Sequence, residues 1–284
     1  MKKLVLIDGN SLLNRAYYAT PVFTTKSGTP TNAIFGFVKL LFKILGDIKP
    51  EYIIVAFDLK APTFRHKMFD GYKATRKSMP DELAVQVEPL NNLLKAMNIA
   101  ICSKEGMEAD DVIGTLSKRF DVHSYIYTGD RDSFQLVDEK TDVHFTKKGV
   151  SDLQKLNINN FKAETGLTPS QIIDLKALMG DKSDNIPGVP GIGEKTALSL
   201  LAQYSDLDGA YENLENIISN SVKSKLTENR ESAFMSYKLA TIDRNCELDI
   251  SLDNCTTPLK YGDDVKKLFK ELEFNSFLSM DIFE

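Results

Sequence analysis

Acidic residues follow three apolar runs of this sequence, each where the run ends. The run LVLI ends at Asp8, the run YIIVAF ends at Asp58, and SYIYT is followed closely by Asp130 and Asp132. The carboxyl ends of parallel strands meet at one edge of a sheet, so these side chains are expected to converge there. A single aspartate after a strand usually only begins a turn. Three such ends together favour a shared site.

A second acidic group lies in the segment EGMEADDVIG, at the start of a predicted helix. It contains Glu108, Asp110 and Asp111. The dipole of a helix favours negative side chains at its N-terminus, but one cap would be enough. Carboxylates this close together repel one another unless cations neutralise them. The loop GDKSDN adds Asp181 and Asp184, which are expected to turn toward the same edge of the sheet.

These carboxylates have no accompanying set of His or Cys ligands, because His66, His123 and His144 are scattered along the chain. Sites made only of oxygen ligands suit Mg²⁺ or Mn²⁺ rather than zinc. Two or more such ions can activate a water and stabilise the leaving oxygen of a phosphodiester. The predicted chemistry is therefore phosphodiester hydrolysis without a protein nucleophile.

A glycine-rich turn precedes a helix in the segment GVPGIGEKTA. Such a turn directs backbone amides and a helix N-terminus at a phosphate, and a lysine beside it adds positive charge. A plain corner between two helices would also need glycines, but the lysine favours binding to a nucleic-acid backbone without regard to base sequence. The candidate contacts are Gly188, Gly191, Ile192, Gly193, Lys195 and Thr196.

Basic and aromatic residues share a predicted helix face in the segment APTFRHKMFDGYKATRKSMP. Such a face can hold phosphates and stack on unpaired bases. A solvated charged helix is an equally open alternative on this segment alone, and its position next to Asp58 favours the binding surface. Gly71 weakens the predicted helix, which suggests ordering on substrate binding. The residues at helical spacing are Arg65, Phe69, Tyr72 and Arg76, with Lys73 beside them.

Apolar runs and helical patterns alternate over residues 1–167, which predicts an α/β domain with a mostly parallel central sheet flanked by helices. Strands are expected over residues 4–7, 52–57, 99–102 and 124–128, and helices over about 31–45, 80–97 and 108–120. The pattern becomes helical at Thr168, a predicted N-cap with Pro169 at the first helical position and Gln171 as its capping-box partner. Residues 168–284 are thus expected to form an all-α subdomain, with the helix-hairpin-helix at about 172–203 and further helices near 227–242 and 264–272.

The net charge of −5 argues at first against a nucleic-acid partner. Setting the nine candidate ligands aside leaves 31 acidic residues against 35 basic ones, so the overall sign decides nothing. The N-terminal apolar run is too short for a signal peptide, and no run could cross a bilayer. Three cysteines without metal-ligand spacing fit a reducing compartment. A cytoplasmic protein with no membrane partner is expected.

Together, the motifs LIDGNSLLNRAYYA, FDLKAPTFRHKMFDGYKATR, EADD, TGDRDSFQLV and GDKSDNIPGVPGIGEKTA resemble the 5′ nuclease domain of bacterial DNA polymerase I, within the flap endonuclease superfamily. The resemblance covers essentially the whole chain. It implies a structure-specific 5′ nuclease, both 5′–3′ exonuclease and flap endonuclease, in RNA primer removal and DNA repair near the bacterial nucleoid. It also implies a metal-ligand role for Asp8, Asp58, Glu108, Asp110, Asp111, Asp130, Asp132, Asp181 and Asp184.

The same resemblance assigns roles to basic residues and to partners. A helical arch at about residues 60–80 would present Arg65, Tyr72, Lys73 and Arg76 to the 5′ strand and the scissile phosphate, and Arg15 would face DNA. Backbone carbonyls of the hairpin would hold a K⁺ ion. The implied partners are DNA with 5′ flaps or 5′ ends and RNA–DNA primers. A monomer is expected. A polymerase domain is expected in cis or in trans, because the chain ends about where this domain ends in the family.

Two other functions compete with this reading. One is a catalytically inert DNA-binding scaffold that keeps the hairpin and the arch, and the complete acidic set argues against it. The other is a nuclease directed at RNA, built on a related carboxylate-lined core. The hairpin, which suits a duplex backbone, favours DNA.

Overall fold

The computed structural model describes residues 1–149 and 152–283 and consists of two compact units. The first, here called the sheet unit, comprises residues 1–59, 78–157 and 243–284. The second, the helical unit, comprises residues 60–77 and 158–242. Each unit is therefore assembled from segments that lie far apart in the sequence.

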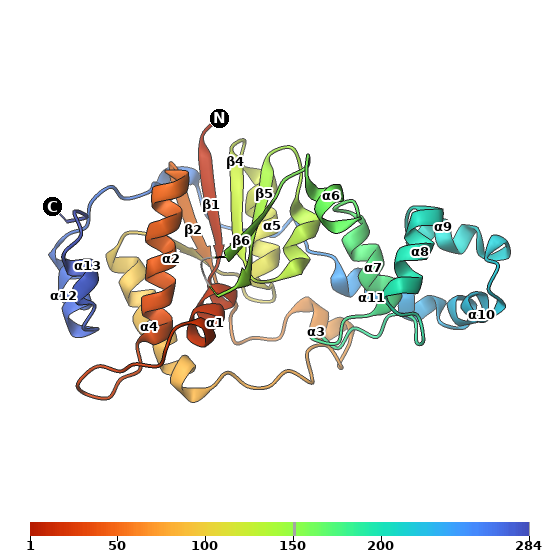
Figure 1. Ribbon diagram of the computed structural model, residues 1–284, viewed down its shortest axis with the longest axis horizontal. Helices are drawn as coiled ribbons and strands as arrows, with labels where there is room; N and C mark the ends of the chain where they lie inside the picture. The colour runs from red at the N-terminus through yellow and green to blue at the C-terminus, as the bar shows by residue number, and fades with distance from the viewer. Residues whose placement is uncertain (150–151, 284) are drawn as a thin grey trace. The chain divides into compact units, whose positions relative to one another are not determined.

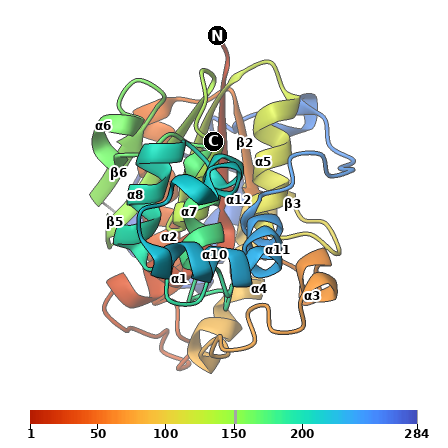
Figure 2. The same cartoon turned by 90° about the vertical axis from the view of Figure 1, so that its right-hand side faces the viewer.

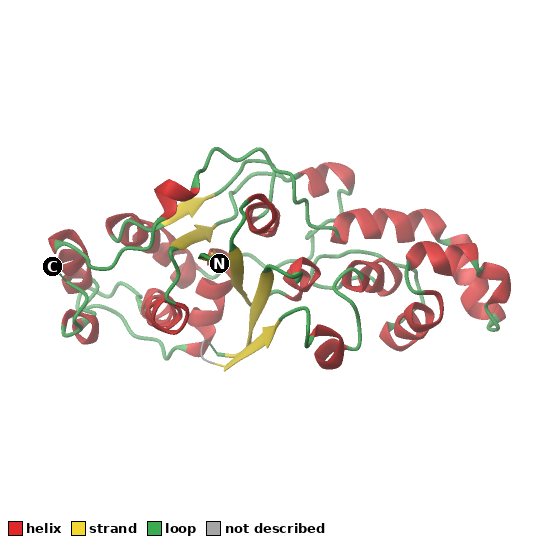
Figure 3. Ribbon diagram, turned by 90° about the horizontal axis from the view of Figure 1, so that it is seen from above, coloured by secondary structure: helices red, strands yellow, loops and turns green. Residues whose placement is uncertain are grey.

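A six-stranded sheet with the order β3-β2-β1-β4-β5-β6 forms the centre of the sheet unit. All neighbouring strands pair in parallel except β5 and β6, which are antiparallel, so the predicted mostly parallel sheet is confirmed. Figure 3, seen from above, shows the strands in a row with helices on both sides. The strands are β1 (Lys3–Asp8), β2 (Tyr52–Ala56), β3 (Ala100–Cys102), β4 (His123–Thr128), β5 (Thr141–Lys148) and β6 (Asp152–Leu156).

Alternate residues of the central strands face different helices, as the pleat requires. Val5 and Ile7 of β1 pack in one core with the helices α1, α2 and α4. The helix α5 packs on β1 and β2 with its own buried face. Figures 1 and 2 show α2 and α5 on different sides of the strands. The bounds are α1 (Gly9–Ala19), α2 (Asn32–Ile48), α4 (Asp81–Ala96), α5 (Ala109–Arg119) and the 3₁₀ helix η1 (Arg131–Leu136).

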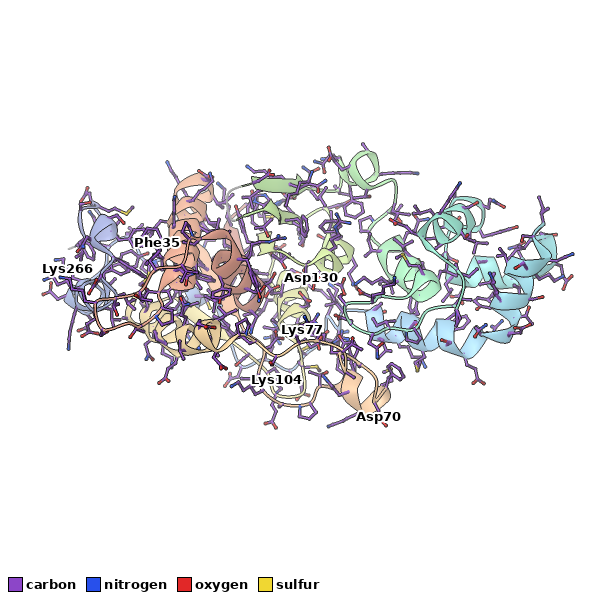
Figure 4. All side chains as sticks on the ribbon, turned by 60° about the horizontal axis from the view of Figure 1, so that its bottom comes forward. Phe35, Asp70, Lys77, Lys104, Asp130 and Lys266 are labelled. Atoms are coloured by element: carbon purple, nitrogen blue, oxygen red, sulfur yellow. The ribbon has the colours of Figure 1, made fainter. Side chains whose placement is uncertain are left out.

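The C-terminal segment packs against this core through aromatic side chains. Phe35 of α2, labelled in Figure 4, stacks on Phe277 with ring centroids 4.9 Å apart. Val265 and Phe269 are fully buried in the same core as α2 and α4. Because this apolar face is covered there, residues 243–284 belong to the sheet unit rather than to the helical one. The elements are η3 (Leu252–Cys255), α12 (Asp263–Glu271) and α13 (Asn275–Leu278).

The helical unit is built around α7, which packs against both α8 and α11. Gln171 begins α7, two residues after the predicted start, and its side chain accepts a hydrogen bond from the Thr168 amide at 2.9 Å. Half of the predicted capping box is thus present. The helices are α3 (Phe64–Met68), α6 (Phe161–Thr165), α7 (Gln171–Met179), α8 (Glu194–Tyr204), α9 (Leu207–Glu212), η2 (Leu214–Asn216), α10 (Asn220–Glu228) and α11 (Arg230–Ala240).

The predicted helix from Arg65 to Arg76 is wrong. Only α3 is helical, and the chain then turns, with Lys73 in the left-handed region at φ 55°. Phe69 and Tyr72 do not form an exposed stripe, because they pack in a small core with Ile186 and Leu239. Tertiary packing and the weak helix-former Gly71 together outweigh the periodic pattern.

Several other elements were not predicted. Among them are α1, which begins directly after Asp8 as its N-cap, and the strands β5 and β6, which lie beyond the clear apolar runs. In the described part of the chain, no helix has the length and apolar character needed to cross a bilayer.

Candidate active site

A threonine hydroxyl connects two of the strand-end carboxylates. The register places Ile7 of β1 beside Tyr127 of β4, so the two strands end level with each other. The buried Thr128 hydroxyl donates to the Asp8 carboxylate at 2.8 Å and accepts from the Asp130 amide at 2.9 Å. Asp8 also caps α1 by accepting from the Ser11 amide. Figure 4 labels Asp130, which lies just beyond the end of β4.

The second strand end is tied to the start of α5. The carboxylate of Asp58 accepts from the Ala109 amide, the first of α5, at 2.8 Å. The Asp58 amide in turn donates to the side chain of Asn10 at 2.8 Å. Asp110, one residue further along α5, accepts from the Ser133 hydroxyl of η1 at 3.2 Å. These bonds join three strand ends and one helix start into a single acidic edge of the sheet unit.

The electrostatics of this edge show that its carboxylates act on each other. Burial first, and then the negative charges of Asp58 and Asp130, raise the pKa of Asp8 to about 7. Burial and the charges of Asp130, Asp8, Asp132 and Asp58 raise the pKa of Asp110 well above its usual range. Such a set resists ionisation unless cations are supplied.

The chemistry of this donor set fits hard divalent cations, because such cations prefer carboxylate oxygens as ligands. Within residues 1–149 and 152–283, no three His, Cys, Asp or Glu side chains are already grouped as ligands of one ion. The metal therefore remains a proposal.

Asp111 has structural partners that the sequence did not reveal. It is fully buried, and one of its oxygens accepts from the Glu108 amide at 3.0 Å in a reciprocal capping box. The other oxygen accepts from the Asp243 amide at 2.8 Å. Asp111 thus holds both the start of α5 and the returning chain at residue 243.

Asp181 and Asp184 belong to the helical unit and have partners there. Burial raises the pKa of Asp181, but the Lys176 ammonium at 2.5 Å and hydrogen bonds from Ser183 lower it to about 2. Asp184 is 5% exposed. It accepts from the Arg76 guanidinium at 2.5 Å and the Tyr72 hydroxyl at 3.1 Å. Their placement with the other seven carboxylates stays a prediction.

The predicted arch residues fall into two classes. Arg65 is 3% exposed, and its guanidinium donates to the carbonyls of Leu239 and Thr241 at the end of α11. Tyr72 is equally buried, so neither side chain presents a surface on which a base could stack. Lys73 and Arg76 are less enclosed, and both lie beside Asp184. The predicted aromatic stacking face is therefore not formed in this structure.

The glycine-rich turn forms the connection from α7 to α8 that the sequence predicts. Gly188 has φ +61°, and a side chain there would come within 2.2 Å of the Gly180 nitrogen, so only glycine fits. Two serines of α11 hold it: the Ser232 hydroxyl donates to the Gly188 carbonyl at 2.7 Å, and Ser236 accepts from its amide at 2.9 Å. Gly193 is the N-cap of α8 and contributes no side-chain cap.

The remaining candidate contacts differ in exposure. Gly191, Gly193 and Lys195 are exposed, Thr196 is half-buried and Ile192 is buried, which makes Ile192 an anchor of the turn. Arg15 lies in the sheet unit, where its guanidinium donates to the Thr146 carbonyl at 2.6 Å.

Sequence reasoning missed the neutral residues that position the charged ones. These residues are Thr128, Asn10, Ser133, Ser232 and Ser236. Asn10 and Thr128 stand inside the motifs LIDGN and YTGD, so their proximity to the aspartates was an available signal. The two serines of α11 had none, because they lie more than 40 residues from Gly188.

Comparison with known proteins places these observations in a family. Two family models match, the 5′-3′ exonuclease N-terminal resolvase-like domain over residues 3–166 and the 5′-3′ exonuclease C-terminal SAM fold over residues 167–261. The chain belongs to the 5′–3′ exonuclease family. Membership makes it a nuclease, a hydrolase of phosphodiester bonds. The models meet close to the predicted boundary at residue 168, although the packing divides the chain differently.

Relatives and solved structures agree with this assignment. The chain is 44% identical over 280 residues to DNA polymerase I of Bacillus caldotenax. The matching region covers 98% of this chain and 32% of that protein. The chain thus spans about a third of the length of this relative. The 5′-exonuclease of bacteriophage T5 with bound zinc has the same fold, with a TM-score of 0.70 at 21% identity over 96% of this chain and 99% of that one. The T5 flap endonuclease, in a pseudo-enzyme-product complex with DNA and metal ions, gives a TM-score of 0.70 at 19% identity. The match covers 96% of this chain and 98% of that one.

Thermal stability of the metal-free chain should fall as the pH rises from 4 to 7. The pKa of Asp8 is about 7 in the folded chain against an ordinary 3.8, so the folded state retains a proton that the unfolded state has released. Raising the pH through this window therefore lowers the free energy of unfolding. We expect Asp8→Asn to melt several degrees above the unsubstituted chain at pH 8 in EDTA.

At pH 4 the two proteins should melt nearly alike. The buried His144, whose pKa is lowered to about 4, acts in the opposite sense but equally in both proteins. Calorimetry across this range measures the difference. Equal melting at pH 8 would show that Asp8 carries no destabilising charge.

Asp111→Ala should destabilise the fold more than Asp110→Ala. Its removal leaves the buried amides of Glu108 and Asp243 without these acceptors, at a cost of about 1–3 kcal/mol for each unsatisfied group. Removing Asp110 instead relieves repulsion between carboxylates. Urea unfolding of the two variants in EDTA makes the comparison, and a larger loss for Asp110→Ala would contradict the structural role of Asp111.

Proposed function

We propose that the chain is a structure-specific 5′ nuclease, both 5′–3′ exonuclease and flap endonuclease, that hydrolyses DNA with two or more divalent ions. The observation that carries this proposal is the acidic edge of the sheet unit. There, burial and then the charges of neighbouring carboxylates from β1, the end of β2, α5 and the end of β4 raise the pKa of Asp8 and Asp110. An edge of this kind favours cation-assisted phosphodiester hydrolysis within a nuclease family.

The relatives support the choice of substrate. DNA polymerase I acts on DNA, and the T5 flap endonuclease was crystallised with DNA and metal ions. We infer a 5′ flap or 5′ end of DNA as the substrate, with RNA–DNA primers as a further one. RNA primer removal and DNA repair in the bacterial cytoplasm are the corresponding roles. A polymerase domain in cis fits the share of the relative that this chain spans.

The sheet unit contributes the carboxylates that would hold the ions. Mg²⁺ or Mn²⁺, when bound, supplies a water of lowered pKa and stabilises negative charge on the leaving oxygen. Asp8 and Asp130 are held in position by Thr128, and Asp58 by Asn10 and Ala109. Asp132 acts on Asp110 electrostatically, and Glu108 stands at the start of α5. By resemblance to the family, Asp111 and, from the helical unit, Asp181 and Asp184 are proposed as further ligands.

The helical unit contributes the groups that would hold DNA. Lys73 and Arg76 are proposed to position the 5′ strand and its scissile phosphate, while the buried Arg65 and Tyr72 fix the segment that carries them. Backbone amides of the exposed Gly191 and Gly193 and the side chain of the exposed Lys195 are proposed to bind the duplex backbone without regard to sequence.

A 5′-labelled DNA flap duplex tests the proposal directly. With Mg²⁺ we expect cleavage near the junction of the flap, and none in EDTA. A matching RNA flap should be cut more slowly. Gel analysis of product lengths gives the position, the metal dependence and the substrate preference in one experiment.

The competing functions give different results. An inert scaffold would bind the flap duplex but leave it intact with Mg²⁺ or Mn²⁺. A nuclease directed at RNA would cut the RNA flap preferentially.

Lys73→Ala and Arg76→Ala should lower single-turnover cleavage far more than they weaken binding. Fixed cations stabilise charge on the phosphate in the transition state, and removing such a group costs roughly 10²-fold or more. Lys67→Ala, a change of an exposed lysine on α3, is the matched control and should cleave normally.

Rapid-quench kinetics with saturating protein measures the rate, and a titration in Ca²⁺ measures binding. Normal single-turnover rates for both Lys73→Ala and Arg76→Ala would exclude this role.

A further inference from the structure

A lysine from α10 reaches the glycine-rich turn. The ammonium of Lys225 donates to the carbonyl of Gly191 at 3.1 Å. A side-chain carbon built on Gly191 would lie 2.9 Å from this ammonium nitrogen and 3.0 Å from the carbon that carries it. Gly191 also has φ +81°, which favours glycine. The absence of a side chain at Gly191 therefore leaves the space that Lys225 occupies.

The backbone that carries Lys225 is fixed from two directions. Its neighbour Leu226 is fully buried, and the hydroxyl of Tyr211 donates to the Leu226 carbonyl at 3.1 Å. The side chain of Asn229 donates to the carbonyl of Lys225 itself at 2.8 Å and closes the end of α10. Lys225 is thus presented to the turn by a well-anchored helix end.

This contact bears on the K⁺ ion that the family resemblance implies at the hairpin. Both K⁺ and an ammonium are monovalent cations that bind carbonyl oxygens. The Gly191 carbonyl already has a cationic partner from the chain itself. A K⁺ ion at the same carbonyl would stand beside a like charge, which disfavours it. The residues present do not fit a K⁺ site that uses Gly191.

We propose that the ammonium of Lys225 takes the place of a K⁺ ion at the hairpin, so that the turn carries its own cation. This inference rests on the proposed DNA binding by the hairpin. An ammonium has three N–H donors, and the Gly191 carbonyl takes one. The ammonium lies beside Gly191, two residues before Gly193, the N-cap of α8. Its positive charge strengthens the binding of a backbone phosphate by the turn. Binding of DNA then needs no K⁺.

The test compares duplex binding in KCl and in NaCl at the same concentration, with Ca²⁺ in place of Mg²⁺. The unsubstituted chain should bind equally in both salts. Lys225→Met keeps the length of the side chain but not its charge. We expect it to bind roughly tenfold more weakly in NaCl, an effect of one lost cation beside the phosphate, and to recover in KCl. Lys223→Met is the matched control on the same helix, because Lys223 pairs with Glu215, and it should match the unsubstituted chain.

A second measurement uses no DNA. The melting temperature of Lys225→Met should be a few degrees higher in KCl than in NaCl, because K⁺ binds the vacated carbonyl of Gly191. The unsubstituted chain should show no such difference. Circular dichroism establishes that the variant is folded.

Three results would overturn the inference. They are equal binding by Lys225→Met and the unsubstituted chain in NaCl, a preference of the unsubstituted chain for KCl, and a variant whose binding and melting show no preference for KCl. Failure of the proposed function looks different. In that case the unsubstituted chain would not bind the duplex in either salt.

Discussion

Parallel pairing of β1 with β2 and β4 brings the carboxyl ends of three strands to one edge of the sheet, and each end continues into an aspartate. The fold thereby places like charges together against their repulsion. Burial adds to the cost, and the pKa of Asp8 rises to about 7 as a result. Neutral partners help to hold the aspartates there: the Thr128 hydroxyl donates to Asp8 and accepts from the Asp130 amide, and the Asn10 side-chain oxygen accepts from the Asp58 amide. Helices cover both faces of the sheet that carries this edge (Figure 3).

In the helical unit, by contrast, several of the candidate charged groups have a partner of opposite sign or a carbonyl. Asp184 accepts from Arg76 and Tyr72, Asp181 pairs with Lys176, and Arg65 is enclosed by carbonyls at the end of α11. The turn between α7 and α8 is held by serines on one side and by Lys225 on the other. The surface proposed to bind phosphates thus consists of backbone groups and cations that the fold already orients, so that less ordering would be needed when DNA binds.

The disagreements between sequence and structure have a common cause. Helical spacing from Arg65 to Arg76 predicts an amphipathic helix, but the aromatic residues find a small core with Ile186 and Leu239, and the chain turns to reach it. Asp111 looks like one more acidic ligand, yet it satisfies two buried amides, one of them at Asp243. In each case the deciding partner lies more than 100 residues away. Local patterns carry no information about such partners.

The sequence by itself determined the mostly parallel sheet, the acidic edge, the glycine-rich turn and the family, because each is encoded in a short motif whose physical reason is local. Apolar runs form strands, aspartates follow them, and glycines permit a tight turn before a helix. Only the tertiary structure decided that residues 243–284 return to the sheet unit, that Arg65 and Tyr72 are buried, and that Lys225 meets Gly191. These outcomes depend on which distant surfaces remove the most apolar area from water and satisfy the most buried polar groups, and that balance exists only once the whole chain is packed.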